Sequence, residues 1–339
     1  MQYVRLAGFL LPAVALAQTY TDCNPTENST CPSDVGLNQS TYSVNFTSGE
    51  SSDWVMTYGD ASYDDNGLSF TITESGDAPT MQSEFYVFFG TISAVVKASP
   101  GTGIVSCVIL ESDDLDEIDW EWLGGDIDEV QTNYFGKGNT TSYDRGTYET
   151  VGDSQDNWHN YTIEWTSAYT TWWIDGEAVR TLEYADAVDG KNYPQTPMRI
   201  KLGSWSASDS GSEGTIEWAG GETDYDDGPF TMYVQSIDIV NYNPASTYTY
   251  GDLTGDWTSI VLDSPDAVIV NETESSSISS TSSTGSSTSS NSSSSGSSSS
   301  GTSSSSSSSA SGTTATSAGV AQSAPVAGLL LAAISAFFL

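Results

Sequence analysis

Basic side chains are scarce in this sequence. Its 339 residues include 8 Lys and Arg against 45 Asp and Glu, which gives a formal net charge of −37. Nucleic-acid binding requires a basic surface that displaces counterions from phosphates. The composition therefore excludes nucleic acid as a partner, and it excludes a polybasic membrane-surface protein for the same reason. A neutral partner such as an uncharged polysaccharide remains compatible with this charge.

Histidine and cysteine are also few, with one His, His159, and three Cys. These counts exclude metal sites built from several His, a Cys₄ zinc site and acid–base schemes that use two His. We therefore expect neither a metal nor a cofactor. If the chain is a catalyst, carboxylates have to do most of the chemistry.

Helical periodicity is scarce as well, and short β-rich runs recur between clusters of Gly, Asp, Asn and Ser. Many short strands separated by turn signals predict an all-β, antiparallel two-sheet sandwich. We assign it to one domain over residues 18–270, with a hairpin at Asp175-Gly176. The predicted strands lie at 68–73, 83–98, 103–110, 117–123, 129–135, 159–166, 169–174, 198–204, 214–218 and 230–242.

Both ends of the chain read as targeting signals. Residues 1–17 (MQYVRLAGFLLPAVALA) predict a secretory signal peptide cleaved before Gln18, the alternative being a buried N-terminal helix. Residues 313–339 end in a 14-residue apolar stretch, too short to span a bilayer as a helix. Together with the small residues upstream, this stretch predicts a GPI-anchor signal. The signal is removed, and the anchor is attached at Ser311 or Gly312. The alternative is a short tail anchor.

Residues 271–312 form a low-complexity stalk, in which 26 of the 35 residues from 275 to 309 are Ser. Such a segment cannot bury enough apolar area to fold, so we predict a disordered, O-glycosylated spacer. Cys23 and Cys31 are predicted to form a local disulfide, and Cys107 to be a buried apolar side chain. N-glycosylation sequons stand at Asn28, Asn38, Asn45, Asn139, Asn160, Asn271 and Asn291.

The segment 116–123, DEIDWEWL, alternates strictly between acidic and apolar residues. In a strand this places the apolar residues on one face and Glu117, Asp119 and Glu121 on the other. Three aligned carboxylates repel one another and raise at least one pKa. Two other interpretations are an acidic edge strand and a Ca²⁺ site, although a straight strand offers oxygen ligands in a line.

This arrangement suits glycoside hydrolysis, in which one carboxylate acts as a nucleophile and a second carboxyl as a general acid/base. Glu117 and Glu121 could lean toward each other over a concave surface, with Asp119 between them to hold the nucleophile and separate the pKa values. An inverting mechanism is also compatible with the spacing.

The motif EIDWE resembles the E-x-D-x-E strand of glycoside hydrolase family sixteen, a β-jelly-roll family of retaining enzymes. Together with 131–146, 158–165, 203–211 and 214–225, it resembles the fungal Crh-type cell-wall transglycosylases. The resemblance implies Glu117 as nucleophile, Glu121 as acid/base and Asp119 as assisting carboxylate. It also implies cleavage of β-1,4 bonds in chitin, with transfer of the fragment to a β-glucan or chitin chain.

Several further residues are candidates for sugar binding. Alternation in 198–205 places Lys201 and Trp205 on the polar face, and the resemblance supports both of them and Thr215 as substrate-binding residues beside Glu121. Trp205 could instead be buried in the core. Trp218 is assigned to core or rim, and the choice between Tyr134 and Phe135 for the cleft stays open. His159 is predicted to be structural.

The primary hypothesis is a monomeric, GPI-anchored cell-surface transglycosylase whose partners are chitin and β-glucan. A chitin or β-glucan hydrolase with the same residues is one alternative. A non-catalytic wall lectin on the same sandwich is another, but binding a neutral sugar does not require three crowded carboxylates.

Overall fold

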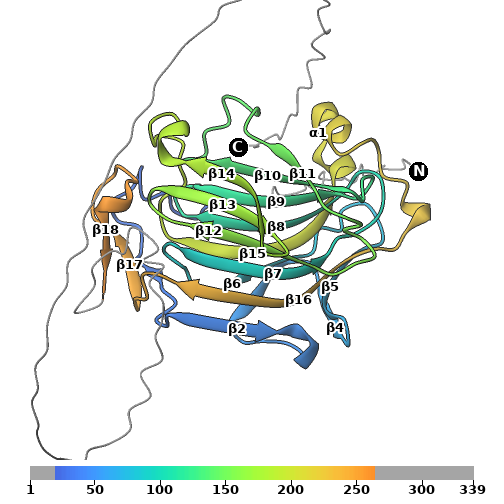
Figure 1. The fold of residues 1–339 in the computed structure, drawn as a ribbon, viewed down its shortest axis with the longest axis horizontal. Helices are drawn as coiled ribbons and strands as arrows, with labels where there is room; N and C mark the ends of the chain where they lie inside the picture. The colour runs from blue at the N-terminus through green and yellow to red at the C-terminus, as the bar shows by residue number, and fades with distance from the viewer. Residues whose placement is uncertain (1–19, 264–339) are drawn as a thin grey trace, which may run out of the picture. The chain divides into compact units, whose positions relative to one another are not determined.

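A computed structural model describes residues 20–263. Two large antiparallel sheets stack into a sandwich, which confirms the predicted fold class (Figure 1). The seven-stranded sheet has the order β11 (Thr147–Thr150), β10 (Glu129–Phe135), β9 (Glu117–Leu123), β8 (Ile104–Ser112), β15 (Met198–Ser206), β6 (Thr80–Ser83) and β3 (Trp54–Tyr58).

The second large sheet has the order β14 (Glu177–Glu183), β13 (Tyr169–Ile174), β12 (His159–Trp165), β7 (Gly90–Lys97), β16 (Phe230–Asn241), β5 (Gly67–Ile72) and β4 (Ser62–Asp64), and β2 (Thr41–Asn45) also pairs with β16. A small sheet contains β1 (Asp34–Val35), β17 (Thr247–Tyr250) and β18 (Ile260–Leu262). Figure 1 shows β17 and β18 at one end of the sandwich and helix α1 (Glu213–Trp218) at the other. Short 3₁₀ turns occur at Phe46–Ser48, Tyr184–Asp186, Ala207–Ser210, Tyr225–Asp227 and Trp257–Ser259.

The core lies between the two large sheets, and β9 supplies its aromatic centre. Ile118, Trp120 and Trp122 are fully buried, as the alternation of β9 predicts. The two indoles stack with centroids 6.4 Å apart, and the ring of Tyr161 from β12 meets both edge-on. Aromatic packing thus fixes β9 against the opposite sheet.

A second link between the sheets is polar. The indole Nε1 of Trp172 on β13 donates to the backbone carbonyl of Asp119 on β9, at 3.0 Å. Arg180 on β14 stacks over Trp172 at 4.7 Å, and its Nη1 donates to the carbonyl of Thr132 on β10, at 2.7 Å. Side chains of the eight-stranded sheet therefore hold the backbones of two strands of the seven-stranded sheet.

Most predicted strands are present, and 117–123, 129–135 and 169–174 have the predicted bounds. The hairpin turn Asp175-Gly176 is also present, with positive φ at both residues (51° and 83°), as the tight turn requires.

Two strand predictions are wrong. Residues 214–218 belong to helix α1, whose N-cap Ser212 accepts a hydrogen bond from the Thr215 amide, so local capping decides the conformation of this short segment. The single strand predicted at 83–98 is two strands, β6 and β7, because the aromatic run 85–89 between them packs into the core as a connection. The short strands β1, β2, β3, β4, β11, β17 and β18 were not predicted.

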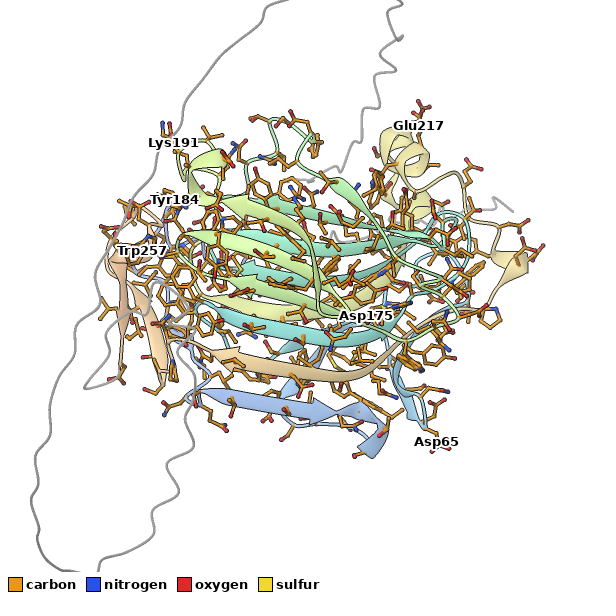
Figure 2. The ribbon with its side chains drawn as sticks, viewed as in Figure 1. Asp65, Asp175, Tyr184, Lys191, Glu217 and Trp257 are labelled. Carbon is orange, nitrogen blue, oxygen red and sulfur yellow. A yellow bond between two sulfur atoms is a disulfide. The ribbon has the colours of Figure 1, made fainter. Side chains whose placement is uncertain are left out.

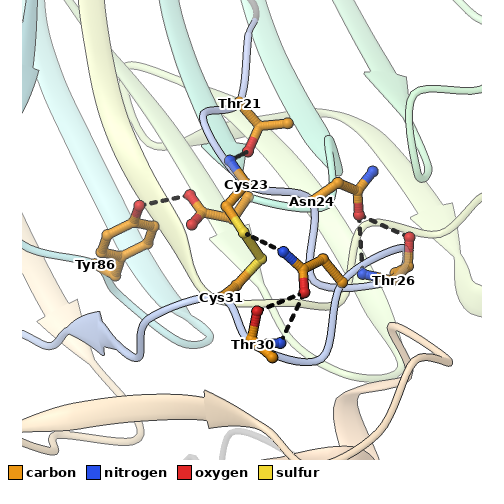
Figure 3. Close-up of a disulfide and its surroundings, with 9 residues drawn as sticks. Thr21, Cys23, Asn24, Thr26, Thr30, Cys31 and Tyr86 are labelled. Carbon is orange, nitrogen blue, oxygen red and sulfur yellow. Dashed lines mark hydrogen bonds between the residues drawn. A yellow bond between two sulfur atoms is a disulfide. The ribbon is translucent and has the colours of Figure 1, made fainter.

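The N-terminal segment (residues 20–33) lies against the seven-stranded sheet and contains the Cys23–Cys31 disulfide (Figure 3). Beside the disulfide, the Tyr86 hydroxyl donates to Asp113 at 2.6 Å. Asn24 and Asn28 close tight turns by accepting from Thr26 and Thr30. Because these bonds and the disulfide fix the segment locally, it has a defined shape beside the sheet.

The sequons of the described chain differ in exposure. Asn28, Asn38 and Asn45 are exposed, whereas Asn139 and Asn160 are half-buried. The Asn139 side-chain nitrogen donates to Asn192 at 2.9 Å, which makes it the least accessible acceptor on geometric grounds.

The predicted signal peptide (1–17), the stalk (271–312), the anchor signal (313–339), Asn271, Asn291, Ser311 and Gly312 lie outside the described residues. Among residues 20–263, the structure contains no helix that is long and apolar enough to cross a membrane.

We predict that Trp122→Ala lowers the free energy of unfolding by about 3–5 kcal/mol, because it opens a cavity under Tyr161 in the core. Val240 is 45% exposed on β16, so Val240→Ala should stay within about 0.5 kcal/mol of the wild type. Denaturant unfolding followed by tryptophan fluorescence measures both changes. Equal stability of the two variants would contradict the assigned role of β9.

Candidate active site

Strand β9 presents Glu117, Asp119 and Glu121 on the side of the sheet opposite to Trp120 and Trp122, as the sequence predicts. Asp119 is 1% and Glu121 is 6% exposed, while Glu117 is partly exposed. We call the side of the seven-stranded sheet that carries these three residues the carboxylate face. The strand is central in its sheet, so the interpretation as an acidic edge strand is wrong.

Neighbouring strands add residues to the carboxylate face in register. Three rows run across the strands, each containing one of the three carboxylates. The rows are Gln131–Glu121–Cys107–Gly203, Asn133–Asp119–Ile109–Lys201 and Phe135–Glu117–Glu111–Arg199. Phe135 therefore faces Glu117, whereas Tyr134 pairs with Ile118 and packs into the core, which answers the question that the sequence left open.

Burial dominates the electrostatics of the three carboxylates. It raises the pKa of Glu121 to about 7. Burial also raises the pKa of Glu117 to about 7, although a hydrogen bond with Asp119 and the charges of Lys201 and Arg145 counteract it. Burial and the charges of Glu117 and Glu121 raise the pKa of Asp119 well above its ordinary value.

These shifts bring protons onto the carboxylate face near neutral pH. No hydrogen-bond donor within residues 20–263 reaches either carboxylate oxygen of Asp119. The interaction between the Asp119 and Glu117 carboxyls raises the pKa of Asp119 and lowers the pKa of Glu117, so it favours a proton on Asp119. Burial raises the pKa of both Glu117 and Glu121 to about 7, so near this pH each is protonated in part of the molecules. The face can therefore offer one acid and one carboxylate at the same time.

Lys201 lies on the carboxylate face as predicted, but it is buried and forms an ion pair with Glu111. The backbone amide of Tyr20 donates to the other oxygen of Glu111 at 2.8 Å, and the Lys201 ammonium lies 4.7 Å from the centre of the Tyr20 ring. Glu111 is directly opposite Glu117 in the sheet. A cation and its counter-ion thus stand beside Glu117.

Trp205, Thr215 and Trp218 come together at the α1 end of the seven-stranded sheet. Trp205 is half-buried and stacks on the buried Trp218 with centroids 6.2 Å apart. Because 214–218 is helical, Thr215 and Trp218 are three residues apart on one face of α1, and both are buried. Trp205 therefore keeps a partly exposed ring supported from behind, and Trp218 belongs to the packing.

Arg145 is a neighbour of this site that the sequence did not indicate. Its guanidinium lies 4.7 Å from the centre of the Phe135 ring, and its Nη2 donates to the carbonyls of Asn139 and Ser142. Arg145 holds the 139–145 loop over the carboxylate face, where its charge lowers the pKa of Glu117.

His159 and Cys107 have different surroundings. His159 is on β12 in the other sheet, and its ring nitrogens lie 2.7 Å from Asp175 and 3.0 Å from the Gly152 carbonyl, which fits a structural role. Asp175 is labelled at its turn in Figure 2. Cys107 is buried, as predicted, but it pairs with Glu121 and contacts the Gly203 carbonyl at 3.4 Å.

Sequence reasoning did not single out Glu111, Gln131, Asn133 or Arg145. Glu111 begins the acidic run ESDDLD, which reads as a loop. The usable signal was the alternation of Ile109 and Glu111 at the end of β8, which places a lone acidic residue on the carboxylate side of a buried strand.

Comparison with known proteins gives consistent matches. Residues 48–220 match the family described as "Glycosyl hydrolases family 16". Crh-like protein 1 of Aspergillus fumigatus is 55% identical over 278 residues, covering 82% of this chain and 74% of that protein. Crh-like protein 5 of the same organism is 57% identical over 249 residues, covering 73% and 63%.

Solved structures agree with this relationship. The structure "Crh5 transglycosylase in complex with NAG" is similar with a TM-score of 0.70 and 56% identity, covering 71% of this chain and all of that chain. A Bacillus licheniformis β-glucanase has a TM-score of 0.51 at 20% identity, covering 60% of this chain and 99% of that chain. This second likeness shows a common fold.

We predict that the free energy of unfolding falls as the pH rises from about 5 to 8. Burial raises the pKa of Glu117 and Glu121 from 4.5 to about 7, so in this interval the folded protein holds protons that the unfolded chain has released. Glu121→Gln removes one such group and should flatten the slope by up to about 1.4 kcal/mol per pH unit. Denaturant unfolding across this range tests the prediction. Parallel curves for the two proteins would contradict it.

Proposed function

We propose that this chain, which belongs to the family 16 glycosyl hydrolases and is a glycosidase/transglycosylase enzyme, cleaves β-1,4 linkages of chitin and transfers the fragment to β-glucan or chitin acceptors in the fungal cell wall. The observation that carries the proposal is the row of three carboxylates on β9, two of them buried and all three with a raised pKa. The similar Crh5 transglycosylase is in complex with NAG in its solved structure, which supports a chitin donor.

The reaction proceeds by double displacement. Glu121 donates its proton to the glycosidic oxygen while the Glu117 carboxylate attacks the anomeric carbon, which gives a glycosyl ester on Glu117 and a free leaving chain. Glu121, now ionised, takes a proton from an acceptor hydroxyl, and that oxygen displaces Glu117. Asp119 acts through Glu117, because its interaction with Glu117 lowers the pKa of the nucleophile and so favours the carboxylate.

Glu121, Lys201, Trp205 and Thr215 contact the sugar chain in this proposal. The half-buried Trp205 ring offers a stacking surface supported by Trp218. The Lys201 ammonium, paired with Glu111, supplies a fixed cation beside Glu117. Thr215 is 2% exposed on α1, so it contributes by a short contact at the rim or by holding Trp205 in place.

The same geometry suits hydrolysis, since water or a sugar hydroxyl can attack the glycosyl ester. Transfer occurs when the acceptor occupies the site and excludes water. A non-catalytic lectin does not account for the three adjacent carboxyls with raised pKa values, because binding a neutral sugar requires none.

The location of the enzyme is part of the proposal. Residues 1–17 serve as a signal peptide, 18–270 as the catalytic domain, 271–312 as an O-glycosylated stalk and 313–339 as a GPI signal. The domain acts as a monomer at the cell surface. N-glycans at Asn28, Asn38 and Asn45 would lie on exposed positions.

Transfer is tested with the secreted protein, chitin oligosaccharides and a fluorescent laminari-oligosaccharide, with products separated by mass. The wild type should form labelled hybrids. Glu121→Gln should lower the rate by about 10²- to 10⁴-fold, because the leaving group loses its acid. Glu117→Gln should remove all turnover. Asp175→Asn, in the other sheet, is the control variant.

Each outcome of the transfer assay has one meaning. Hybrids that persist in Glu117→Gln would contradict the assigned nucleophile. Shortened chitin without hybrids would identify a hydrolase. Sugar binding by a wild type that shows no turnover would identify a lectin.

Anchoring is tested by expressing the full chain in a fungal host and treating cells with a phosphatidylinositol-specific phospholipase. We expect release of the protein, and we expect Ser311→Trp with Gly312→Trp to abolish membrane attachment, because a small residue is required at the cleavage site. Protein that stays in the membrane after treatment, with its tail still detectable, would identify a tail anchor.

A further inference from the structure

A cavity of about 220 Å³ lies beside the carboxylate face, between the N-terminal segment and the seven-stranded sheet. The sheet contributes Gln82, Glu111, Arg199 and Lys201 to one wall. The opposite wall consists of the N-terminal segment from Tyr20 to Cys23 and the start of β1 at Asp34. At ~30 Å³ per water, it has room for about seven water molecules, which is the scale of one sugar ring.

The cavity adjoins the candidate catalytic residues. Glu111 in its wall is directly opposite Glu117, and Lys201 lowers the pKa of Glu117 by its charge. A chain bound along the carboxylate face would therefore pass from Glu117 into the cavity across the Glu111–Lys201 ion pair.

The lining is polar, and its charges are close to balanced. Lys201 pairs with Glu111, and burial raises the pKa of Asp34 to about 8, so Asp34 carries a proton at acidic pH. The other charged side chains of the lining are Arg199, Asp22 and Asp113. Asp34 is 5% exposed, and one of its carboxylate oxygens has no hydrogen-bond partner in the described chain. Such a lining suits a neutral ligand with many hydroxyl groups.

Tyr20 gives the cavity an aromatic surface. Tyr20 is 50% exposed, while its backbone amide is fixed by Glu111 and the Lys201 ammonium lies over its ring. An anchored, half-exposed aromatic ring at the edge of a polar cavity is the arrangement that stacks against a pyranose.

We propose that this cavity is a further sugar subsite, in which the N-terminal segment forms one wall and Tyr20 stacks on one β-linked pyranose of a bound chain. The proposal deepens the function proposed above and rests on it. The ligand class is a neutral, equatorially hydroxylated sugar ring, which both a chitin donor and a glucan acceptor contain.

Calorimetric binding to the full chain carrying Glu117→Gln tests the subsite without any turnover. Chito-oligosaccharides and laminari-oligosaccharides of increasing length are titrated in separate arms. Affinity should rise at the length that first reaches the cavity. Tyr20→Ala should remove that rise, a loss of about two- to tenfold, and Tyr20→Phe should retain it because the ring is kept. The oligosaccharide series in which this rise in affinity occurs identifies the polysaccharide that occupies the subsite.

A second variant guards against a simple folding defect. Asp34→Asn keeps the size of the side chain and should also reduce the step. Val240→Ala, on the other sheet, should leave the whole length series unchanged. Equal weakening by Tyr20→Ala at every length, or no step in either series, would overturn the subsite. If the wild type binds with the expected step but transfers nothing, the proposed function fails and the subsite stands.

Discussion

Glu117, Asp119 and Glu121 share one strand with little solvent around them, and removing three charges from water costs more than a protein of this size can offset with charge pairs alone. The molecule meets this cost by retaining protons. Burial raises the pKa of Glu117 and Glu121 to about 7 and that of Asp119 well above its ordinary value. Lys201 and Arg145 lower the pKa of Glu117 by their charge, and both are held by other groups. Burial thus brings the carboxyls into the range in which an acid and a carboxylate coexist.

That burial depends on the other side of the same strand. Trp120 and Trp122 fill the core, so β9 cannot slip by one residue without exposing two indoles and burying the acids among apolar side chains. This constraint is local in sequence, which is why alternation alone predicted the strand bounds, both faces and the three carboxylates. The hairpin at Asp175-Gly176 was predictable for the same reason, since its turn chemistry lies in two adjacent residues.

Some features of the site could not be predicted from the sequence. They depend on pairing between strands that are distant in the chain, or on a small local preference for helix over strand. Glu111 meets Glu117 only through the β8–β9 register, and Lys201 meets Glu111 only through β15. The N-terminal amide that bonds Glu111 is 91 residues away in the chain. Residues 214–218 alternate well enough for a strand, and only the Ser212 cap and the packing of Trp218 on Trp205 select the helix. Resemblance to a known family supplied Thr215, which no spacing argument could have placed.

The indole of Trp172 bonds the backbone of Asp119 from the far sheet, and Arg180 bonds that of Thr132 beside it. The position of β9 and β10 relative to the opposite sheet is therefore set partly by residues outside the carboxylate face. Substitutions of Trp172 or Arg180 would shift the backbone of β9 or β10 without changing a side chain on the carboxylate face. The far sheet is therefore part of the support of the carboxylate face, although none of its side chains belongs to that face.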